Sequence, residues 1–321
     1  MKNQARFLVA DIGGTHCRFA LFSAAPLRML GQCRVPSAGI SFDTVLDRAR
    51  LARPALFEHK AQLCVLAVAG IVLGQHSVAL SNLPYTISAE QCQAVAEKVV
   101  FINDFAAQAY ACLGSALQGA ALLWAGSGAH KPKVVAAGRY AVIGAGTGLG
   151  TAFLHKEEHT GWQVFASEGG HATLPLLSRE ELALGEFLCQ RKGKDFLYWE
   201  DVLSGSGLAL LHEWLTGEAS QPQAITAQQG FARSKTCALF ALFYGRYCHD
   251  VALQSLSRSG IVLTGGVAAA CPALVQHPAF AKALHCGGTP AYAAWLRSLP
   301  LWHSSHDDTG LWGAAHYAAS L

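Results

Sequence analysis

The sequence has few charged residues and no strong excess of either sign. Charged side chains make up 14% of its 321 residues, whereas hydrophobic ones make up 52%. The 24 Lys and Arg against 21 Asp and Glu leave a formal net charge of +3, so neither nucleic acid nor an anionic membrane surface is expected as the main partner. The apolar content is ample for a buried core and excludes wholesale disorder. A chain of this length predicts one large domain or two ordinary ones.

Segments that would place the chain in a membrane are also missing. The longest uncharged stretch, residues 105–129, exceeds the roughly 20 residues of a spanning helix, but glycine, serine and glutamine interrupt it. It predicts a buried helix, a turn and a second apolar segment. The apolar run at residues 7–10 is too short for a secretory signal. We therefore expect a cytoplasmic protein without a membrane partner.

Cysteines in paired spacing are absent, although the chain has ten cysteines. Without a CxC or CxxC pair, zinc-finger and thioredoxin arrangements are excluded. Dispersed single cysteines in a chain without an export signal are mostly small buried hydrophobic residues.

The two common phosphate-binding loops are absent as well. The motif GxxxxGK[ST] fails because the only Gly-Lys pair, at 193–194, is followed by Asp195. The motif GxGxxG fails because a start at Gly144 and Gly146 would require its third glycine at Leu149.

Two glycine turns are present instead, each after an apolar strand. The first comprises Asp11, Ile12, Gly13, Gly14 and Thr15, and the second comprises Gly146, Thr147 and Gly148. Apolar residues resume after each turn, so both segments predict a β-hairpin. Glycine there either adopts positive φ or lets a ligand approach the backbone, whose N–H groups suit phosphates. Two ordinary tight turns are the alternative. Asp11, beside two glycines at a strand end, is placed to meet hydrated Mg²⁺ rather than to fill a core.

Strand and helix signals alternate along the rest of the chain. Short apolar strands are expected at residues 63–68, 99–102 and 261–264, and the patterns that follow Ser88 and Ser178 fit capping boxes at helix starts. Residues 126–138 and 216–229 are linker-like. This alternation predicts an α/β architecture with largely buried sheets. Two glycine hairpins, each opening one half of the chain, suggest two related α/β lobes.

Polar residues stand between apolar segments at three places. Asn103 and Asp104 follow a predicted strand and precede a helical segment, where both residue types also serve as N-caps. Glu168 and His171 flank two glycines, and Glu200 precedes a helical segment, where an acid also suits the first turn. Each is a candidate for binding or catalysis, and each has a purely structural alternative.

Seven motifs occur in the order and approximate spacing of the bacterial glucokinase family, which the chain resembles over about residues 6–318. They are Asp-Ile-Gly-Gly-Thr at 11–15, Ile-Asn-Asp-Phe at 102–105, Gly-Ala-Gly-Thr-Gly-Leu-Gly at 144–150, Glu-Gly-Gly-His at 168–171, Val-Leu-Ser-Gly at 202–205, Thr-Gly-Gly at 264–266 and Thr-Gly-Leu-Trp-Gly-Ala at 309–314. The family belongs to the sugar-kinase/actin/heat-shock-70 ATPase superfamily. The zinc-binding CxCGxxGC element of the related repressor/open-reading-frame/kinase group is missing, which excludes that branch.

The resemblance implies a two-lobed, actin-like (ribonuclease H-like) α/β fold, with duplicated domains and a cleft between them. Residues 1–113 plus 305–321 would form a smaller N-terminal lobe, and residues 114–304 a larger C-terminal lobe. The implied reaction is ATP-dependent phosphorylation of glucose to glucose 6-phosphate, a glycolytic step, with Mg²⁺ accompanying ATP. A homodimer is compatible with the resemblance.

The resemblance also implies a role for each candidate residue. Asp104 would be the general base on the 6-hydroxyl of the sugar. Sugar binding would involve Asn82, Asn103, Asp104, Glu168, His171 and Glu200. The turns at 11–15 and 146–148 would hold the phosphates, Gly265 and Gly266 the adenosine, and Asp11 would act on Mg²⁺ through water.

Departures from the family pattern leave other activities open. Residues 68–71 lack the Pro-containing turn that the family usually has, which loosens one wall of the sugar site, and His16 replaces a shorter polar residue. The alternatives are a kinase of mannose or an amino sugar, a catalytically silent sugar sensor, and an actin-like filament or chaperone ATPase. Asp104 argues against the sensor, and the candidate sugar acceptors argue against the filament protein. Polyphosphate or ADP are alternative donors.

Overall fold

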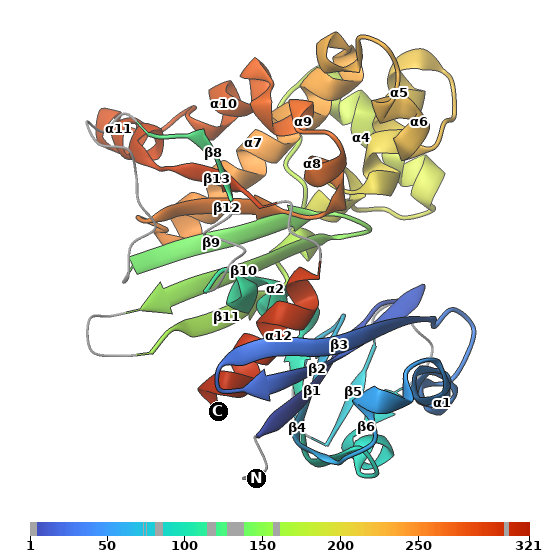
Figure 1. Cartoon of the computed structure of the whole chain (residues 1–321). Coiled ribbons are helices and arrows are strands. Elements are labelled where there is room, and N and C mark those ends of the chain that lie inside the picture. The colour runs from blue at the N-terminus through green and yellow to red at the C-terminus, as the bar shows by residue number, and fades with distance from the viewer. Residues whose placement is uncertain are drawn as a thin grey trace. The chain divides into compact units, whose positions relative to one another are not determined.

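The computed structural model of the chain describes residues 5–72, 74, 76–80, 86–113, 120–126, 138–156, 161–304 and 308–321 (Figure 1). The chain divides into two compact units, each built around its own β-sheet. Unit 1 comprises Met1–Gln118 and His306–Leu321, and unit 2 comprises Gly119–Ser305.

The sheet of unit 1 has five strands in the order β3-β2-β1-β4-β7. They are β1 (Arg6–Ile12), β2 (His16–Ala24), β3 (Leu27–Pro36), β4 (Ala61–Val68) and β7 (Ala96–Asn103). The first three are antiparallel, whereas β4 and β7 run parallel to β1. The register pairs Ile12 with Val68 and Val68 with Asn103, so the carboxyl ends of the three parallel strands meet at one edge of the sheet. In open α/β sheets this edge is where ligands bind.

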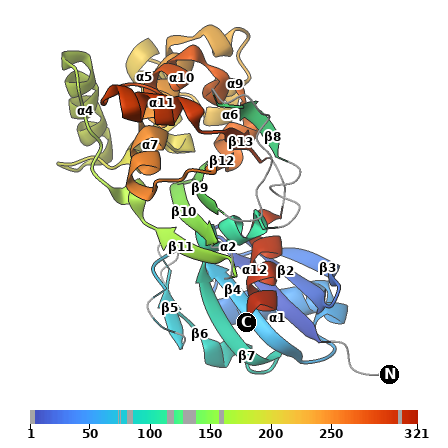
Figure 2. The ribbon, with the colours of Figure 1, turned by 90° about the vertical axis from the view of Figure 1, so that its left-hand side faces the viewer.

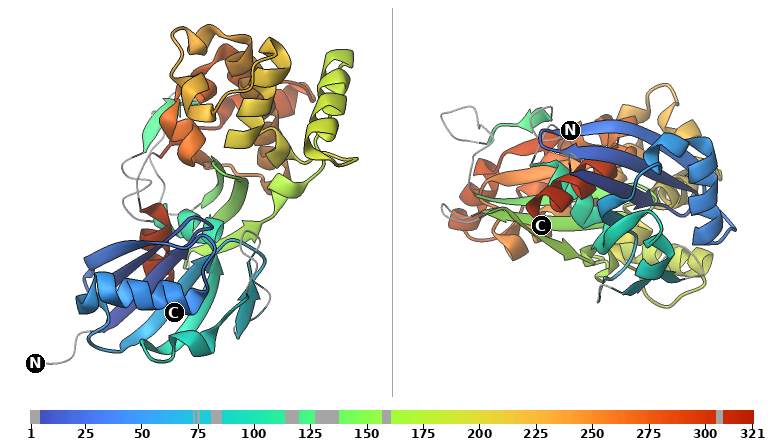
Figure 3. Two further views of the ribbon diagram at one scale, coloured as in Figure 1. Left: turned by 90° about the vertical axis from the view of Figure 1, so that its right-hand side faces the viewer. Right: turned by 60° about the horizontal axis from the view of Figure 1, so that its bottom comes forward.

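Helices cover both faces of this sheet. Helix α1 (Phe42–Ala52) lies across one face (Figure 3), where Phe42 and Val45 belong to the same buried cluster as Phe19 of β2. Helices α2 (Asp104–Ala111) and α12 (Thr309–Ser320) pack together, and Trp312 of α12 meets Phe22 of β2 edge to face at 5.1 Å. The smaller elements of unit 1 are η1 (Pro54–Leu56), β5 (Ser77–Ala79), β6 (Thr86–Ser88) and η2 (Ala89–Cys92).

The sheet of unit 2 has six strands in the order β11-β10-β9-β12-β13-β8 (Figure 2). They are β8 (Ala121–Trp124), β9 (Gly138–Ala145), β10 (Leu149–Lys156), β11 (Gln163–Ser167), β12 (Gly260–Thr264) and β13 (Leu301–His303). Strand β9 forms the hairpin with β10 and pairs parallel with β12, just as β1 pairs with β2 and β4. The two sheets therefore share one plan, which confirms the prediction of two related α/β lobes.

Helix α7 forms the centre of unit 2. The helices and helical turns of this unit are η3 (Gly169–His171), α4 (Arg179–Lys192), η4 (Trp199–Asp201), α5 (Gly205–Thr216), α6 (Pro222–Thr226), η5 (Phe231–Arg233), α7 (Lys235–Ser255), α8 (Gly266–Ala270), α9 (Ala273–Gln276), α10 (Pro278–Leu284) and α11 (Pro290–Ser298). Phe240 and Tyr244 of α7 are fully buried, and Tyr244 meets Phe280 of α10 at 5.7 Å. A Cβ at Gly245 would collide with the carbonyl of Phe280, so this glycine lets α10 approach closely.

The expected strands agree with the structure, whereas two helix signals and one linker expectation differ, and residues 127–137 of the other linker-like segment lie outside the described residues. Ser88 and Gln91 form a complete capping box, but it opens the 3₁₀ turn η2 rather than an α-helix. Ser178 accepts from the amide of Glu181, whereas the Glu181 carboxylate accepts from Leu177 instead of completing the box. The linker-like segment 216–229 contains the short helix α6.

The long uncharged stretch divides as expected, in so far as it is described. Helix α2 starts it and β8 follows, whereas residues 114–119 and 127–129 lie outside the described part of the chain. Within the described ranges, we find no helix that has both the length and the apolar character needed to cross a membrane. All ten cysteines are described and free, and seven are buried, although Cys286 is exposed.

Candidate active site

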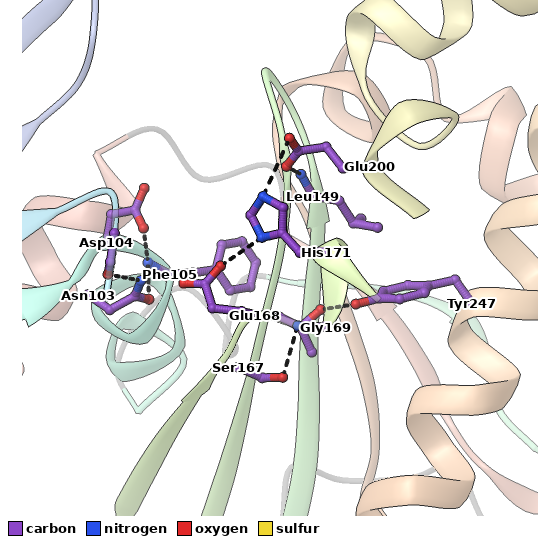
Figure 4. A network of polar contacts seen from close by, with 12 residues as sticks. Asn103, Asp104, Phe105, Leu149, Ser167, Glu168, Gly169, His171, Glu200 and Tyr247 are labelled. Carbon is purple, nitrogen blue, oxygen red and sulfur yellow. Dashed lines mark hydrogen bonds and ion pairs between the residues drawn. The ribbon is translucent and has the colours of Figure 1, made fainter. Parts of the chain in front are cut away.

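Asn103 and Asp104 lie where β7 ends and α2 begins. Asn103 Oδ1 accepts from the amides of Phe105 and Ala106 at 3.0 Å each, and its Nδ2 donates to the carbonyl of Gly70 at 3.1 Å. Asp104 Oδ1 accepts from the amide of Phe105 at 2.8 Å (Figure 4). Asn103 is therefore the N-cap of α2, which was the structural alternative to a binding role. It also fixes the loop after β4 through its bond to Gly70. The Asp104 side chain is half-buried in the first turn of α2.

Asp11 lies near the end of β1, directly across from Arg18 of β2. Burial raises the pKa of Asp11, which Arg18 opposes and Asp308 reinforces. Arg18 also donates to Asp308 at 3.1 Å, so its charge is shared between two carboxylates. A Cβ at Gly310 would lie 2.9 Å from Oδ2 of Asp11, so glycine leaves room for this carboxylate beside α12.

The first glycine turn is held by short hydrogen bonds. The amide of Gly13 donates to the carbonyl of His16 at 3.1 Å, and the hydroxyl of Ser37 donates to the carbonyl of Gly13 at 2.7 Å. Neither Gly13 nor Gly14 has positive φ. A Cβ at Gly13 would instead lie 2.7 Å from the carbonyl of His16, so close backbone approach explains this glycine.

The second glycine turn is held by backbone and side-chain groups of unit 2. Its Gly146 amide donates to the carbonyl of Gly148 at 2.8 Å, and the amide of Gly205 donates to the Gly146 carbonyl at 2.9 Å. The amide of Leu149, directly after the turn, donates to Oε2 of Glu200 at 2.8 Å. A Cβ at Gly148 would collide with the same oxygen. A side chain at residue 148 would therefore displace the Glu200 carboxylate that lies against the turn.

Gly265 and Gly266 follow β12, the parallel neighbour of β9. Gly265 has φ +90°, and a Cβ there would lie within 3 Å of the carbonyl group of Ala145, so only glycine fits. A Cβ at Gly146 would be 3.9 Å from the amide nitrogen of Gly266. The second glycine turn and the turn after β12 are therefore neighbours at one edge of the sheet.

Glu168, His171 and Glu200 form a row of polar side chains in unit 2 (Figure 4). Nδ1 of His171 lies 3.0 Å from Oε2 of Glu168, and its Nε2 lies 4.0 Å from Oε1 of Glu200. The three side chains are 45%, 49% and 35% exposed respectively, so a ligand can reach them. A carboxylate only accepts, so Nδ1 carries the proton of the bond to Glu168, and a neutral His171 then presents Nε2 as an acceptor.

Buried groups support this row from below. Asp201, beside Glu200, pairs with Lys194 and with Lys192 at 2.9 Å and accepts from the amide of Tyr198 at 2.7 Å. Burial raises the pKa of Asp201, but these partners outweigh burial and leave the pKa below its usual value. Near Gly169, the hydroxyls of Tyr247 and Thr151 form a buried hydrogen bond of 2.6 Å.

Most of the predicted site residues are described, and they fall into two groups, one in each unit. Unit 1 carries Asp11, the first glycine turn, Asn103 and Asp104, whereas unit 2 carries the second turn, Gly265, Gly266 and the Glu168–His171–Glu200 row. Asn82 lies outside the described residues. Among the residues that are described, no three His, Cys, Asp or Glu side chains are grouped so that they could hold a metal ion.

Sequence reasoning did not find three contributors to these groups. Arg18 was detectable in principle, because a short turn after Asp11 fixes the cross-strand register. Asp308 and Tyr247 carry no such signal, since their partners Arg18 and Thr151 are 290 and 96 residues away.

Comparison with known proteins agrees with the fold. The family model described as Glucokinase matches residues 8–321. A glucokinase of Xanthomonas oryzae pv. oryzae (strain MAFF 311018) is 32% identical over 324 residues, which cover 97% of this chain and 94% of that protein. A glucokinase of Stenotrophomonas maltophilia (strain K279a) is 32% identical over 337 residues, covering 99% and 96%.

Solved structures show the same architecture. The crystal structure of a glucokinase from an Antarctic psychrotroph superposes with a TM-score of 0.75 at 26% identity, covering 98% of this chain and 99% of that one. The Balamuthia mandrillaris glucokinase in complex with glucose has a TM-score of 0.82 at 20% identity, covering 99% and 94%, and supports the fold.

The duplicated sheets, with glycine turns at their strand ends, define a sugar kinase of the actin-like fold. The match extends over nearly the entire chain and to relatives above 30% identity. The chain belongs to the glucokinase family.

Proposed function

We propose that this chain transfers the terminal phosphoryl group of ATP to the 6-hydroxyl of glucose, giving glucose 6-phosphate and ADP in the cytoplasm. The proposal depends above all on the exposed Glu168–His171–Glu200 row in a chain that the glucokinase family model matches over residues 8–321. The row offers adjacent acceptors of the kind that sugar hydroxyls require.

Asp104 is the proposed general base. Phosphoryl transfer passes through a loose transition state, so the enzyme mainly positions the reactants and removes the hydroxyl proton late. A carboxylate at the start of α2, held by the amide of Phe105, is short and well oriented for this proton. Asn103, fixed by the same helix start, would hold a neighbouring hydroxyl.

Glu168, His171 and Glu200 are the proposed readers of the sugar ring. Each accepts from a hydroxyl of glucose, and a missing or inverted hydroxyl would leave its acceptor unpaired. Sites that hydrogen-bond a substrate hydroxyl reject analogues lacking it by large factors. Selection among hexoses would therefore depend on this row.

The two glycine turns are the proposed phosphate sites, with Gly265 and Gly266 beside the adenosine. In unit 1, a cavity of about 520 Å³ is lined by Arg18, Gln32, Cys33, Arg34 and Asp308. Beside the Asp308 carboxylate, Arg18 and Arg34 leave this cavity with a net positive charge, which would suit an anionic group.

Asp11 fits a water-mediated contact with Mg²⁺ bound to ATP. Burial raises its pKa, so its charge is incompletely compensated by Arg18 and a cation nearby would favour the ionised form. Magnesium bound with ATP neutralises the phosphate oxygens. Asp11 would hold and orient its water shell.

Phosphorylation of another hexose or an amino sugar is the second candidate. Where the family usually has a proline-containing turn, this chain has Gly70 at φ +140°, and the Gly70 carbonyl accepts from Asn103. A flexible residue at this point of the sugar site would widen the range of accepted sugars.

An ADP-release assay coupled to NADH oxidation tests both candidates. Purified protein is given ATP with glucose, mannose, glucosamine or N-acetylglucosamine, and product formation from glucose with ADP or polyphosphate is measured separately. We expect the highest kcat/KM with glucose and ATP. Turnover with none of the sugars would contradict the proposed function, and a preference for another sugar would favour the second candidate.

A further inference from the structure

Glu200 touches two functional groups with its two oxygens. Oε2 accepts from the amide of Leu149 at 2.8 Å, immediately after the second glycine turn. Oε1 lies 4.0 Å from Nε2 of His171, on the side of the sugar acceptors (Figure 4). One carboxylate therefore belongs both to the sugar row and to the phosphate turn.

The turn is shaped around this contact. A Cβ at Gly148 would displace the Glu200 carboxylate, and a Cβ at Gly170 would collide with the carbonyl of Leu149. The N–H of Leu149 thus donates to Glu200, and its carbonyl lies against Gly170, between Glu168 and His171. Both Glu200 and this segment belong to the proposed sugar site.

The backbone that carries Glu200 is fixed. Its neighbours Trp199 and Asp201 are 3% and 5% exposed, and Asp201 is paired with two lysines. The amide of Trp199 also donates to the carbonyl of Ala172 at 3.0 Å. Because the backbone is fixed, the conformational freedom of Glu200 lies in its side-chain rotamer, and this side chain is 35% exposed.

We propose that Glu200 is a positioning residue that couples binding of the two substrates. A sugar hydroxyl that donates to its carboxylate fixes the rotamer that also accepts from Leu149, and so orders the second glycine turn before the nucleotide binds. The inference rests on the proposed function, because it requires the sugar and the nucleotide to bind at these sites. Since the first substrate has already ordered the turn, the second one binds more tightly.

Calorimetric titration measures this coupling directly. Glucose and the non-hydrolysable analogue AMPPNP are titrated separately and then each in the presence of the other, with Mg²⁺ throughout. In the unmodified protein each ligand should tighten the other by the same factor, of about fivefold or more. In Glu200→Gln the factor should fall to about one.

Two matched variants separate coupling from simple loss of affinity. Glu168 lies on the other side of His171, away from the contact between Glu200 and the turn. In Glu168→Gln, glucose should therefore bind more weakly while the coupling factor persists. Glu186→Gln, on the exposed side of α4, should change neither. Gly148→Ala breaks the Glu200 contact from the turn and should abolish coupling as Glu200→Gln does, which covers the case that one variant fails to fold.

Hydrogen exchange supplies a readout without nucleotide or turnover. Glucose alone should slow exchange of the amides of residues 146–150 in the unmodified protein and in Glu168→Gln, but not in Glu200→Gln. A coupling factor of one in the unmodified protein, or full coupling in Glu200→Gln, overturns the inference and leaves the proposed function standing. A protein that binds no hexose overturns both.

Discussion

Asp104 and Glu168 are both carboxylates at the starts of helical turns, yet their proposed roles have opposite kinetic signatures. A base that removes a proton late stabilises the transition state but adds little to the affinity for the sugar. An acceptor of a ring hydroxyl contributes to the bound sugar and to its discrimination. Steady-state kinetics can therefore tell the two roles apart at single residues.

Replacing Asp104 tests the base. In Asp104→Asn we expect kcat to fall by about 10²–10⁴-fold, while the Kd of glucose, from calorimetry, changes little. Asp47→Asn is the matched control, because its side chain is 70% exposed on α1 of the same unit. An unchanged kcat in Asp104→Asn would remove this residue from the catalytic step.

Replacing Glu168 tests the acceptor row. In Glu168→Gln the loss of a charged acceptor should raise the KM of glucose by about tenfold, the lower end for a hydrogen bond to a charged group. The preference for glucose over mannose should shrink at the same time. With Glu186→Gln as control, unaltered KM and selectivity would show that Glu168 does not contact the sugar.

At the scale of elements, the sequence predicted what is local and missed what is distant. Strands β1, β4, β9 and β12 were predictable because their buried positions form continuous apolar runs that end in glycine or a polar residue. The bond between Glu200 and Leu149 was not, because it joins residues 51 apart through the path of α4 and η4. The resemblance to the family implied which residues form the site, but only the structure showed that Glu200 also binds the amide that follows the second glycine turn.

The contact between α2 and α12 gives a prediction at this scale. A Cβ at Gly313 would collide with the backbone of Ala107, so Gly313→Ala must push the two helices apart. We expect a net loss of stability of about 1–3 kcal/mol, typical of overpacking, despite the roughly 1 kcal/mol that alanine gains in helix propensity.

Thermal unfolding followed by circular dichroism measures this effect. Gly161→Ala is the control, since a Cβ there meets nothing within 4 Å. A melting temperature of Gly313→Ala at or above that of the unmodified protein would show that the helices accommodate the methyl group.

For the molecule as a whole, one buried histidine and two half-buried ones lower the stability in mild acid. Burial lowers the pKa of His285, His303 and His316 below the usual 6.5, and Arg297 adds to the effect at His285. The unfolded chain therefore binds more protons than the folded one as the pH falls below 6.5. Stability that is fully present above this pH is lost progressively on acidification.

Urea denaturation at pH 7.5 and 5.5 measures this loss. We expect a lower midpoint at pH 5.5 and a smaller difference between the two pH values in His303→Leu, whose Nε2 is buried without a partner among the described residues. The exposed His59 gives the control variant His59→Gln. An identical pH difference in His303→Leu would mean that this ring does not contribute.

Unit 1 is assembled from both ends of the described chain, with α12 packed against α2 and β1. During synthesis, the residues of α12 leave the ribosome only after all of unit 2 has been made. Trp312 can therefore pack against Phe22 only after about 290 further residues have been translated. Until the final helix docks, nascent unit 1 presents an apolar sheet face that α2 covers only in part, and such exposed apolar surface is prone to aggregation during synthesis.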